Sequence, residues 1–420
     1  MAPNPEIIKA VEQLDYRVTV GDVASQAGLN INLANQGLLA LATDAGGHMQ
    51  VAESGDIVYL FPKNFRDILR QKYLKLKLQE TWQKVWGVLF YIIRISFGVY
   101  LISSILLIYA AIIAIMIAAN SDRDDRNDNS GGFNFFFFPD LFWYLSPNYG
   151  SPYGGSYEHQ RREKRREKGN LNFFEAVFSF LFGDGNPNAK LEERRWQQIA
   201  AVIRNNGNAV VAQQITPYLD DIGETYQQEY EDYMLPVLTK FNGQPKVSAD
   251  GEIVYTFPEL QVTAGQQPRQ SVSGYLQELR YTFSAASEGQ NMLSAGLGAA
   301  NIVGAIVLGG LLQDGSVAAQ LGGLVAFVQS IYWVLLAYGI GFLGVPLIRY
   351  FWIKQRNSKI TERNRTRQQR AELTANPDIS LQKKITFARE FATETIIDEK
   401  DSVYSTEEDL LEQDFKRLTD

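Results

Sequence analysis

The chain has 420 residues, no cysteine and two histidines, and 47 acidic residues stand against 40 basic ones. The absence of thiols excludes disulfides, thiolate metal sites and cysteine nucleophiles on this chain, and two histidines are too few for a histidine-rich metal site. The net charge of −7 argues against a general nucleic-acid binder. The length allows two or three domains.

Residues 1–62 predict a first soluble module of the winged-helix type. The expected elements are a helix at 3–14, an extended piece at 17–20, helices at 20–27 and 30–41, and strands at 49–52 and 57–61. Gly28 ends the second helix and Asn30 caps the third, while alternating apolar residues mark the strands. Helix, strand, helix, helix and hairpin is the element order of a winged helix.

The next segment predicts the first membrane crossing. Residues 63–84 carry seven basic side chains and predict a basic juxtamembrane helix. Residues 85–119 contain a single charge, Arg94, and exceed the roughly 20 apolar residues that a helix needs to cross a bilayer. Trp82 and Trp86 lie at the start of this run, where interfacial aromatic residues belong.

Residues 120–170 form a loop that is first acidic, then aromatic at 133–146, and then basic at 161–168. The aromatic segment is too short for an ordinary helical span. It predicts either a re-entrant segment or an aromatic loop in the membrane interface, and we favour the first. Residues 171–188 predict an amphipathic helix on the membrane surface, followed by a turn.

Residues 189–262 predict a second winged-helix-like module, because they repeat the pattern of the first. The octet GDIVYLFP at 55–62 returns as GEIVYTFP at 251–258, with six of eight positions identical. The expected elements are a helix at 196–204, a strand at 209–211, helices at 212–219 and 226–241, and a wing at 246–257. By the two-residue period of a strand, Ile57 and Ile253 should point into the core of their modules.

The remaining chain predicts a linker at 263–291, a membrane hairpin and a tail. Residues 292–312 and 317–348 are uncharged and rich in small residues, so they predict two closely packed spans joined by a tight turn. Residues 349–420 predict a C-terminal tail that is first basic and then acidic.

The basic flanks predict the orientation. Residues 63–84, 161–168 and 349–370 are rich in lysine and arginine and should lie on the inner face of the membrane. Three crossings cannot leave both ends of the chain on one side, so a return through residues 133–146 would restore the parity. Both modules and the tail are then expected on the cytoplasmic face.

The third helices of the two modules predict contact with protein and not with DNA. Residues 30–47 contain no lysine or arginine. The corresponding region of the second module is acidic, and Lys240 comes only at its end. Because docking on a phosphate backbone needs cations, these helices are poorly suited to the duplex.

The sequence predicts no catalytic, cofactor-binding or metal-binding residue. No motif surrounds His48 or His159, and the segment 183–188 lacks the later ligands of a calcium-binding loop, which leaves a turn as its interpretation. The basic segments 161–168 and 349–370 either bind anionic lipid head groups or fix the topology, and we favour the second.

The segment 172–188, NFFEAVFSFLFGDGNPN, resembles an uncharacterised membrane-protein family of cyanobacteria and plastids, as do both octets and the run ERRW at 193–196. Plant members of that family carry an iron–sulfur cluster biosynthesis label. A chain without cysteine cannot supply the usual thiolates, so that label does not extend to it. The resemblance implies a thylakoid or plasma membrane and adds no catalytic residue.

These features predict a mainly α-helical protein with small β wings, in which two winged-helix-like modules accompany a helical transmembrane region. The expected function is that of a non-enzymatic membrane adaptor or assembly factor without cofactors, whose modules bind a protein partner. A complex of the photosynthetic membrane is one candidate partner, and the chain could also form homo-oligomers. The alternative is a membrane-tethered winged-helix transcription regulator.

Overall fold

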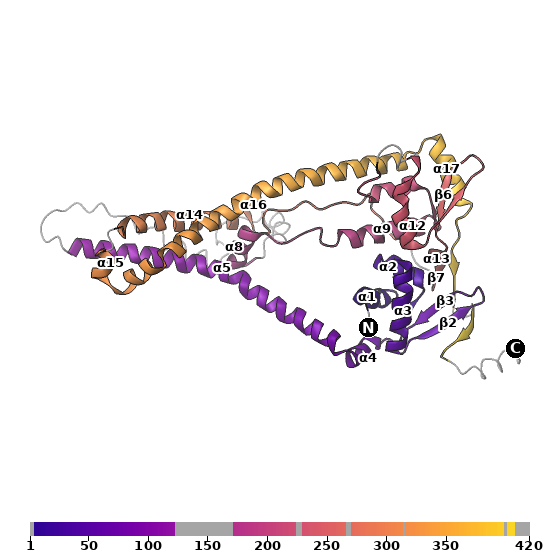
Figure 1. Ribbon diagram of the computed structural model, residues 1–420, viewed down its shortest axis with the longest axis horizontal. Helices are drawn as coiled ribbons and strands as arrows, with labels where there is room; N and C mark the ends of the chain where they lie inside the picture. The colour runs from indigo at the N-terminus through magenta and orange to yellow at the C-terminus, as the bar shows by residue number, and fades with distance from the viewer. Residues whose placement is uncertain are drawn as a thin grey trace, which may run out of the picture. The chain divides into compact units, whose positions relative to one another are not determined.

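The computed structural model describes residues 4–121, 171–223, 229–265, 270–313, 316–398 and 401–407. Over these ranges the chain is mainly helical and contains three small sheets (Figure 1). It divides into two compact units. Unit 1 comprises Met1–Gln83, Pro187–Arg280 and Ser358–Asp420, and unit 2 comprises Lys84–Asn186 and Tyr281–Asn357. The aromatic segment 133–146, the basic cluster 161–168 and His159 lie outside the described residues.

The first module of unit 1 follows the element order expected from the sequence. Its elements are α1 (Pro5–Gln13), β1 (Arg17–Val18), α2 (Val20–Ala27), α3 (Ile31–Ala45), β2 (His48–Ala52) and β3 (Ile57–Leu60). Asn4 caps α1, Asn30 caps α3, and Thr19 and Asp22 form a capping box on α2. These local hydrogen bonds explain why the starts of the helices could be predicted from the sequence.

The second module repeats the arrangement. Its elements are α9 (Leu191–Asn205), β4 (Ala209–Val210), α10 (Ala212–Ile215), the short 3-10 helices η1 (Thr216–Tyr218) and η2 (Asp232–Met234), α12 (Leu235–Phe241), β5 (Gln244–Val247) and β6 (Ile253–Thr256). The strand orders β1-β3-β2 and β4-β6-β5 share one register, since Val18 faces Tyr59 and Val210 faces Tyr255. The third helix is shorter than expected: α12 begins only at Leu235, after the 3-10 helix η2 and after Glu231, whose φ of 54° is left-handed.

The wing strands β3 and β6 are covered on both faces. Tyr59 packs into the main core of unit 1, which the two modules share, while Val58 packs with Ile397 on the opposite face. The expectation for Ile57 was wrong: this residue is 41% exposed because it lies at the turn end of β3, beyond the covering segments. Ile253, at the equivalent position, is partly buried against the core.

The C-terminal region departs from the expected solvated tail and linker. Helix α16 (Gly323–Ala375) continues far beyond residue 348 and is followed by α17 (Ile379–Arg389), β8 (Thr395–Ile396) and β9 (Ser402–Ser405). β8 pairs with β7 (Val262–Thr263), which follows the short helix α13 (Pro258–Gln261), and β9 pairs with β2. Backbone pairing with distant strands, which the local charge pattern does not reveal, holds β8 and β9 in place.

The expected juxtamembrane helix is two helices. α4 (Phe65–Lys72) packs Phe65 and Leu69 fully into the core of unit 1, and α5 (Leu74–Ser121) then carries the apolar run. α4 therefore belongs to the first module as much as to the membrane-proximal segment.

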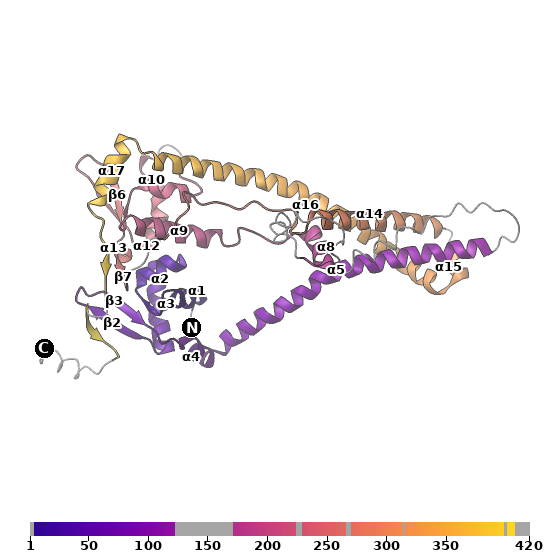
Figure 2. The ribbon, with the colours of Figure 1, turned by 180° about the vertical axis from the view of Figure 1, so that it is seen from behind.

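Unit 2 contains the apolar helices (Figures 1 and 2). Three helical stretches are long and apolar enough to cross a membrane, Lys84–Ala119 in α5, Glu288–Leu311 (α14) and Gly323–Ala375 (α16). The short α15 (Ser316–Leu321) precedes α16, so the last expected span starts six residues later than the apolar run at 317. Inside the bundle, the amide nitrogen of buried Asn301 donates a hydrogen bond to the hydroxyl of Ser104.

Helix α8 (Phe173–Phe182), for which the sequence predicted a place on the membrane surface, packs one of its faces against this bundle. Val177, Phe180 and Leu181 are buried in a cluster with residues of α5, α14 and α16. Gly98 makes this approach possible, because a Cβ at that position would lie 2.6 Å from the ring of Phe174. The helix is too short to span a bilayer.

The packing also fixes the directions of the helices. α5 and α14 run the same way, since Leu101 packs near Leu297 while Ile115 packs in the cluster of Leu312. Residue 121 therefore lies at one end of the bundle, and Leu171, which accepts a hydrogen bond from Gln290, lies at the other. The helix between Gly98 and Ser121 alone covers roughly 35 Å at 1.5 Å per residue.

The burial difference within β3 gives a first prediction. Phe61→Ala should lower the free energy of unfolding of unit 1 by about 3–5 kcal/mol, because it removes a buried ring and leaves a cavity. Ile57→Ala should change it by less than about 1 kcal/mol, as expected for an exposed side chain. Thermal melting of the detergent-solubilised full chain measures both. Equal melting of the two variants would contradict the observed burial.

Candidate interaction surfaces

The two modules meet at the buried carboxylate of Asp22 in α2. Its Oδ1 lies 2.5 Å from a guanidinium nitrogen of Arg204 in α9, and its Oδ2 accepts backbone hydrogen bonds from Thr19 and Ala264, each at 3.0 Å. Arg204 also donates to the hydroxyl of Ser25 at 2.9 Å. Both oxygens are thus satisfied, which is what a fully buried charge requires.

Two glycines allow α2 to come this close to the second module. A Cβ at Gly21 would lie 2.1 Å from the carbonyl oxygen of Glu259 in α13. Gly28 ends α2 with φ of +63°, and a Cβ there would lie 3.0 Å from that of Trp196. Any other residue at either position would push the modules apart.

The outward face of α3 is uncharged. Its exposed side chains are Asn32, Leu33, Asn35, Gln36, Leu39, Ala40 and Thr43. Leu33 is 58% exposed and Leu39 is 51% exposed. Asp44, the single acidic residue of the helix, is bonded to Lys72 at 2.6 Å and to Tyr73, and these hydrogen bonds lower its pKa. We call this exposed set the α3 face.

The third helix of the second module offers no free cation either. The Nζ of Lys240 lies 4.4 Å from the ring centre of Trp196, a cation–π contact. Burial lowers the pKa of this lysine. The side chain thus contributes to the contact between α9 and α12 and is turned away from any ligand of the exposed helix face.

An ion-pair network fixes the end of α16 to the second module. Glu278 binds Arg363 through two hydrogen bonds of 2.7 and 2.5 Å and lies 2.9 Å from Arg367, whose side chain is 1% exposed. Arg367 also binds Asp220, which in turn binds Arg195 of α9. Segments of the expected linker and tail therefore form one charged junction.

A second buried pair holds α17. The Nζ of Lys384 lies 2.6 Å from a carboxylate oxygen of Glu231, and the hydroxyl of Tyr255 donates to the other oxygen at 2.9 Å. Burial, and then the charge of Glu231, raises the pKa of Tyr255. The pair links α17 to the wing strand β6, and Ala388 of α17 covers Val254 on the same strand.

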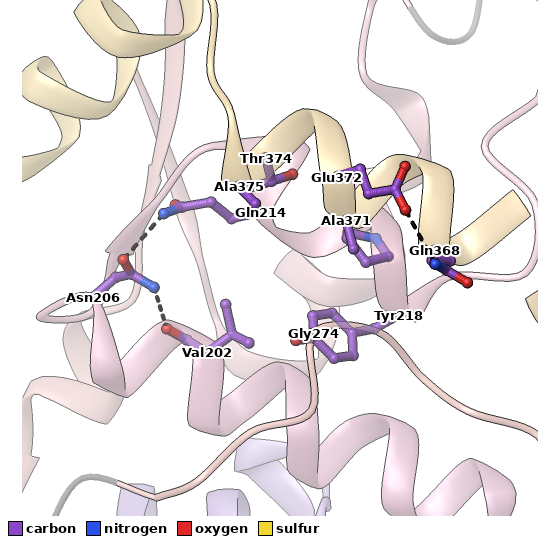
Figure 3. Close-up of a pocket in the computed structure, with 11 residues that line it drawn as sticks. Val202, Asn206, Gln214, Tyr218, Gly274, Gln368, Ala371, Glu372, Thr374 and Ala375 are labelled. Carbon is purple, nitrogen blue, oxygen red and sulfur yellow. Dashed lines mark hydrogen bonds between the residues drawn. The ribbon is translucent and has the colours of Figure 1, made fainter. Parts of the chain in front are cut away.

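An open pocket of about 430 Å³ lies between α9, α10, η1 and the last turns of α16 (Figure 3). Its polar side chains bond to each other or to the backbone: Gln214 donates to Asn206, Asn206 to the carbonyl of Val202, and Gln368 to Glu372. Tyr218 donates to the carbonyl of Ser273 at 2.6 Å. Groups already satisfied in this way offer a ligand few polar contacts.

The described ranges contain no group of three or more histidine, aspartate or glutamate residues placed to hold a metal ion. His48 is half-buried at the start of β2. The Gly-Asp-Gly segment at 183–185 is a turn after α8, in which Asp184 forms an ion pair with Arg94 at 3.2 Å and accepts the backbone N–H of Ala285 at 2.7 Å. Arg94, the single charge of the first apolar run, is thus paired within the protein.

Comparison with known proteins finds a relative in Arabidopsis thaliana, Uncharacterized protein At5g03900, chloroplastic, that is 40% identical over 426 residues. The match covers 97% of this chain and 79% of the relative. The chain belongs to the family of that plant protein. Its chloroplast location agrees with the plastid and cyanobacterial compartment that the resemblance implied. No protein-family model and no solved structure matches the chain.

The junction at Glu278 predicts an acid-sensitive contact. Burial alone would raise the pKa of Glu278, but the hydrogen bonds from Arg363 and the charge of Arg367 outweigh it and lower the pKa below its ordinary value of 4.5. A lowered pKa contributes stability that is complete above the unfolded value and is lost as the pH falls through the folded one. After correction for the pH dependence of the intrinsic exchange rate, hydrogen exchange of residues 360–375 should therefore stay slow at pH 6 and accelerate below about pH 4.

Glu278→Gln provides the control for this prediction. It leaves Arg367 buried without one of its carboxylates and should cost on the order of 3 kcal/mol at neutral pH. The acid-induced acceleration should then shrink, because the titrating group is gone. Unchanged acid sensitivity in Glu278→Gln would show that another group controls the contact.

Proposed function

We propose that this protein is a non-enzymatic integral membrane adaptor or assembly factor, and that unit 1 binds a protein partner next to the membrane. The α3 face carries the proposal: it exposes two leucines among uncharged polar side chains and presents no cation. A surface of this composition suits a protein partner, since apolar and neutral polar contacts dominate the centre of protein interfaces.

The two modules are best interpreted as winged helices. Both have three helical segments and a wing with the same strand order and register. In winged helices the third helix often reads DNA. Here that role is disfavoured, because the cation of α12 is held on Trp196 and α3 has none.

The membrane assignment rests on the length and apolar composition of α5, α14 and α16. Many of their apolar side chains are exposed in the bundle, among them Ile92, Ile306 and Val334 at 58%, 61% and 68%. Helices that expose this many large apolar side chains need lipid or protein to cover them. The chloroplastic relative favours a photosynthetic membrane, with a complex of that membrane as a candidate partner.

The helix directions support an even number of crossings. α5 and α14 start at the same end of the bundle, and α16 returns to it, where Asn357 donates to the carbonyl of Tyr281 at 2.8 Å. Ser121 lies at the opposite end of the bundle, whereas Leu171, where the described chain resumes, lies at the end where α14 starts. All segments of unit 1 would then leave the bundle on one side, which the basic flanks identify as the cytoplasmic or stromal face.

A cysteine-free chain allows a direct test of this topology. Single cysteines at the exposed positions Ser54, Ala249 and Ser380 should react together with a membrane-impermeant maleimide from one side of sealed vesicles. A cysteine at Gln313, between α14 and α15, should react only from the opposite side. Labelling of Ala249→Cys and Ser380→Cys from the side opposite to Ser54→Cys would contradict the even-crossing arrangement and leave a three-span protein.

The α3 face can be tested in the same chain. Crosslinking in native membranes should capture a partner with wild type and lose it with Leu33→Asp/Leu39→Asp, because two charges would have to be buried in the contact. Leu373→Asp, at a leucine 70% exposed on α16, is the matched control and should retain the partner.

The transcription-regulator alternative predicts a different outcome. The purified protein should not shift duplex DNA at about 0.15 M salt, because phosphate contact depends on cations that the third helices lack. A sequence-specific shift that survives competitor DNA and is lost in Leu33→Asp/Leu39→Asp would replace the adaptor by the regulator.

A further inference from the structure

The C-terminal strand β9 closes an edge of the first module that is otherwise open. The sheet has the order β1-β3-β2-β9, so β9 provides the outer neighbour of β2. The backbone N–H of Met49 donates to the hydroxyl of Thr406 at 2.9 Å, and its carbonyl accepts from the N–H of Thr406 at 3.0 Å. These bonds show that Met49 directs its backbone groups away from β3 and toward the edge.

The strand itself is lightly held. Val403 is 39% exposed, and Tyr404 and Ser405 are only half-buried. The firm anchor of the C-terminal region lies earlier, at Ile397, which is 2% exposed, donates to the carbonyl of Thr263 at 2.9 Å and accepts from Arg17 at 2.8 Å. Removal of β9 from β2 would therefore leave the anchor in place.

In the second module, the equivalent strand edge carries a proline. By register, Pro245 pairs with Tyr255 as Met49 pairs with Tyr59. Proline has no N–H to offer at the position where Met49 points its own toward the edge. β5 is the last strand of its sheet in the described chain, and proline on such an edge is a common protection against strand addition. The first module lacks that protection and uses β9 in its place.

We propose that the outer edge of β2 is a strand-acceptor site, which β9 occupies within the chain and which a partner takes over by adding an extended segment of the same chemistry. The facing pairs define that chemistry. Tyr404 lies opposite Val51, and Ser405 lies opposite Gln50. An aromatic side chain across from a β-branched one stabilises such a pair. The partner segment is thus extended, uncharged where it pairs, and carries an aromatic residue followed by a small hydroxyl residue.

This inference deepens the proposed adaptor function and rests on it, yet its test is independent of the α3 face. In the full-length protein in detergent, Tyr404→Pro should remove the N–H that faces β2 and raise hydrogen exchange of Met49 and Val51 at least about tenfold, because their amides face β9 and lose their partners. Ser405→Pro is the matched control. Its N–H points away from β2 by the two-residue period, so protection should remain.

The probe for the acceptor site is a synthetic peptide of residues 401–407. Added to Tyr404→Pro, it should restore protection of Met49 and Val51, and in Met49→Pro/Tyr404→Pro it should not bind. Exchange in α3 reports whether the module is intact, and a chain ending at residue 400 gives the same comparison if Tyr404→Pro disturbs it. The strand-acceptor site would be overturned by unchanged protection in Tyr404→Pro. It would also be overturned if the peptide restored no protection in Tyr404→Pro or in the chain ending at residue 400. Loss of the partner in Leu33→Asp/Leu39→Asp would still support the adaptor.

Discussion

The buried carboxylate of Asp22 joins segments that lie far apart in the sequence. It closes the cap of its own helix, binds Arg204 of the second module and accepts the N–H of Ala264 that follows β7. A buried charge is tolerated only when its oxygens are satisfied, so these contacts must form together. The equivalent residue of the second module, Gln214, is neutral and bonds only to Val211 and Asn206 nearby. The carboxylate of Asp22 therefore links the two modules, whereas the side chain of Gln214 only caps its own helix.

The two modules share one arrangement of helices and strands, but different segments of the chain cover them. The backbone at Gly21 receives α13, whereas the corresponding Gln213 accepts a hydrogen bond from Thr374 of α16. The wing of the first module receives Ile397 and β9, and the wing of the second receives α17. Each cover comes from sequence more than 100 residues away. The last third of the chain thus completes the two modules, and its ion pairs make that contact specific.

The local signals explain what the sequence could predict. Caps at Thr19 and Asn30, the glycine stop at Gly28 and the two wing octets lie within a few residues of the elements they define, so the element order was readable. The uncharged α3 face was readable for the same reason. The burial of Lys384 against Glu231 was not predictable, because a lysine in a polar helix looks solvated until its distant partner is known. Ile57 misled because periodicity gives the face of a strand and not how far its cover extends.

In unit 1, charged side chains hold elements of the fold together, whereas the exposed α3 face is uncharged. Arg204, Arg367, Lys384 and Lys240 all lie in contacts between elements of the unit, so their charges hold the fold and are not available to a phosphate backbone. In the second module, Pro245 also blocks the wing edge. The first module keeps both an exposed apolar helix face and a wing edge with its hydrogen-bonding groups intact. By these contacts the second module is the scaffold, and the first module presents the exposed surfaces on which the proposed contact with a protein partner rests.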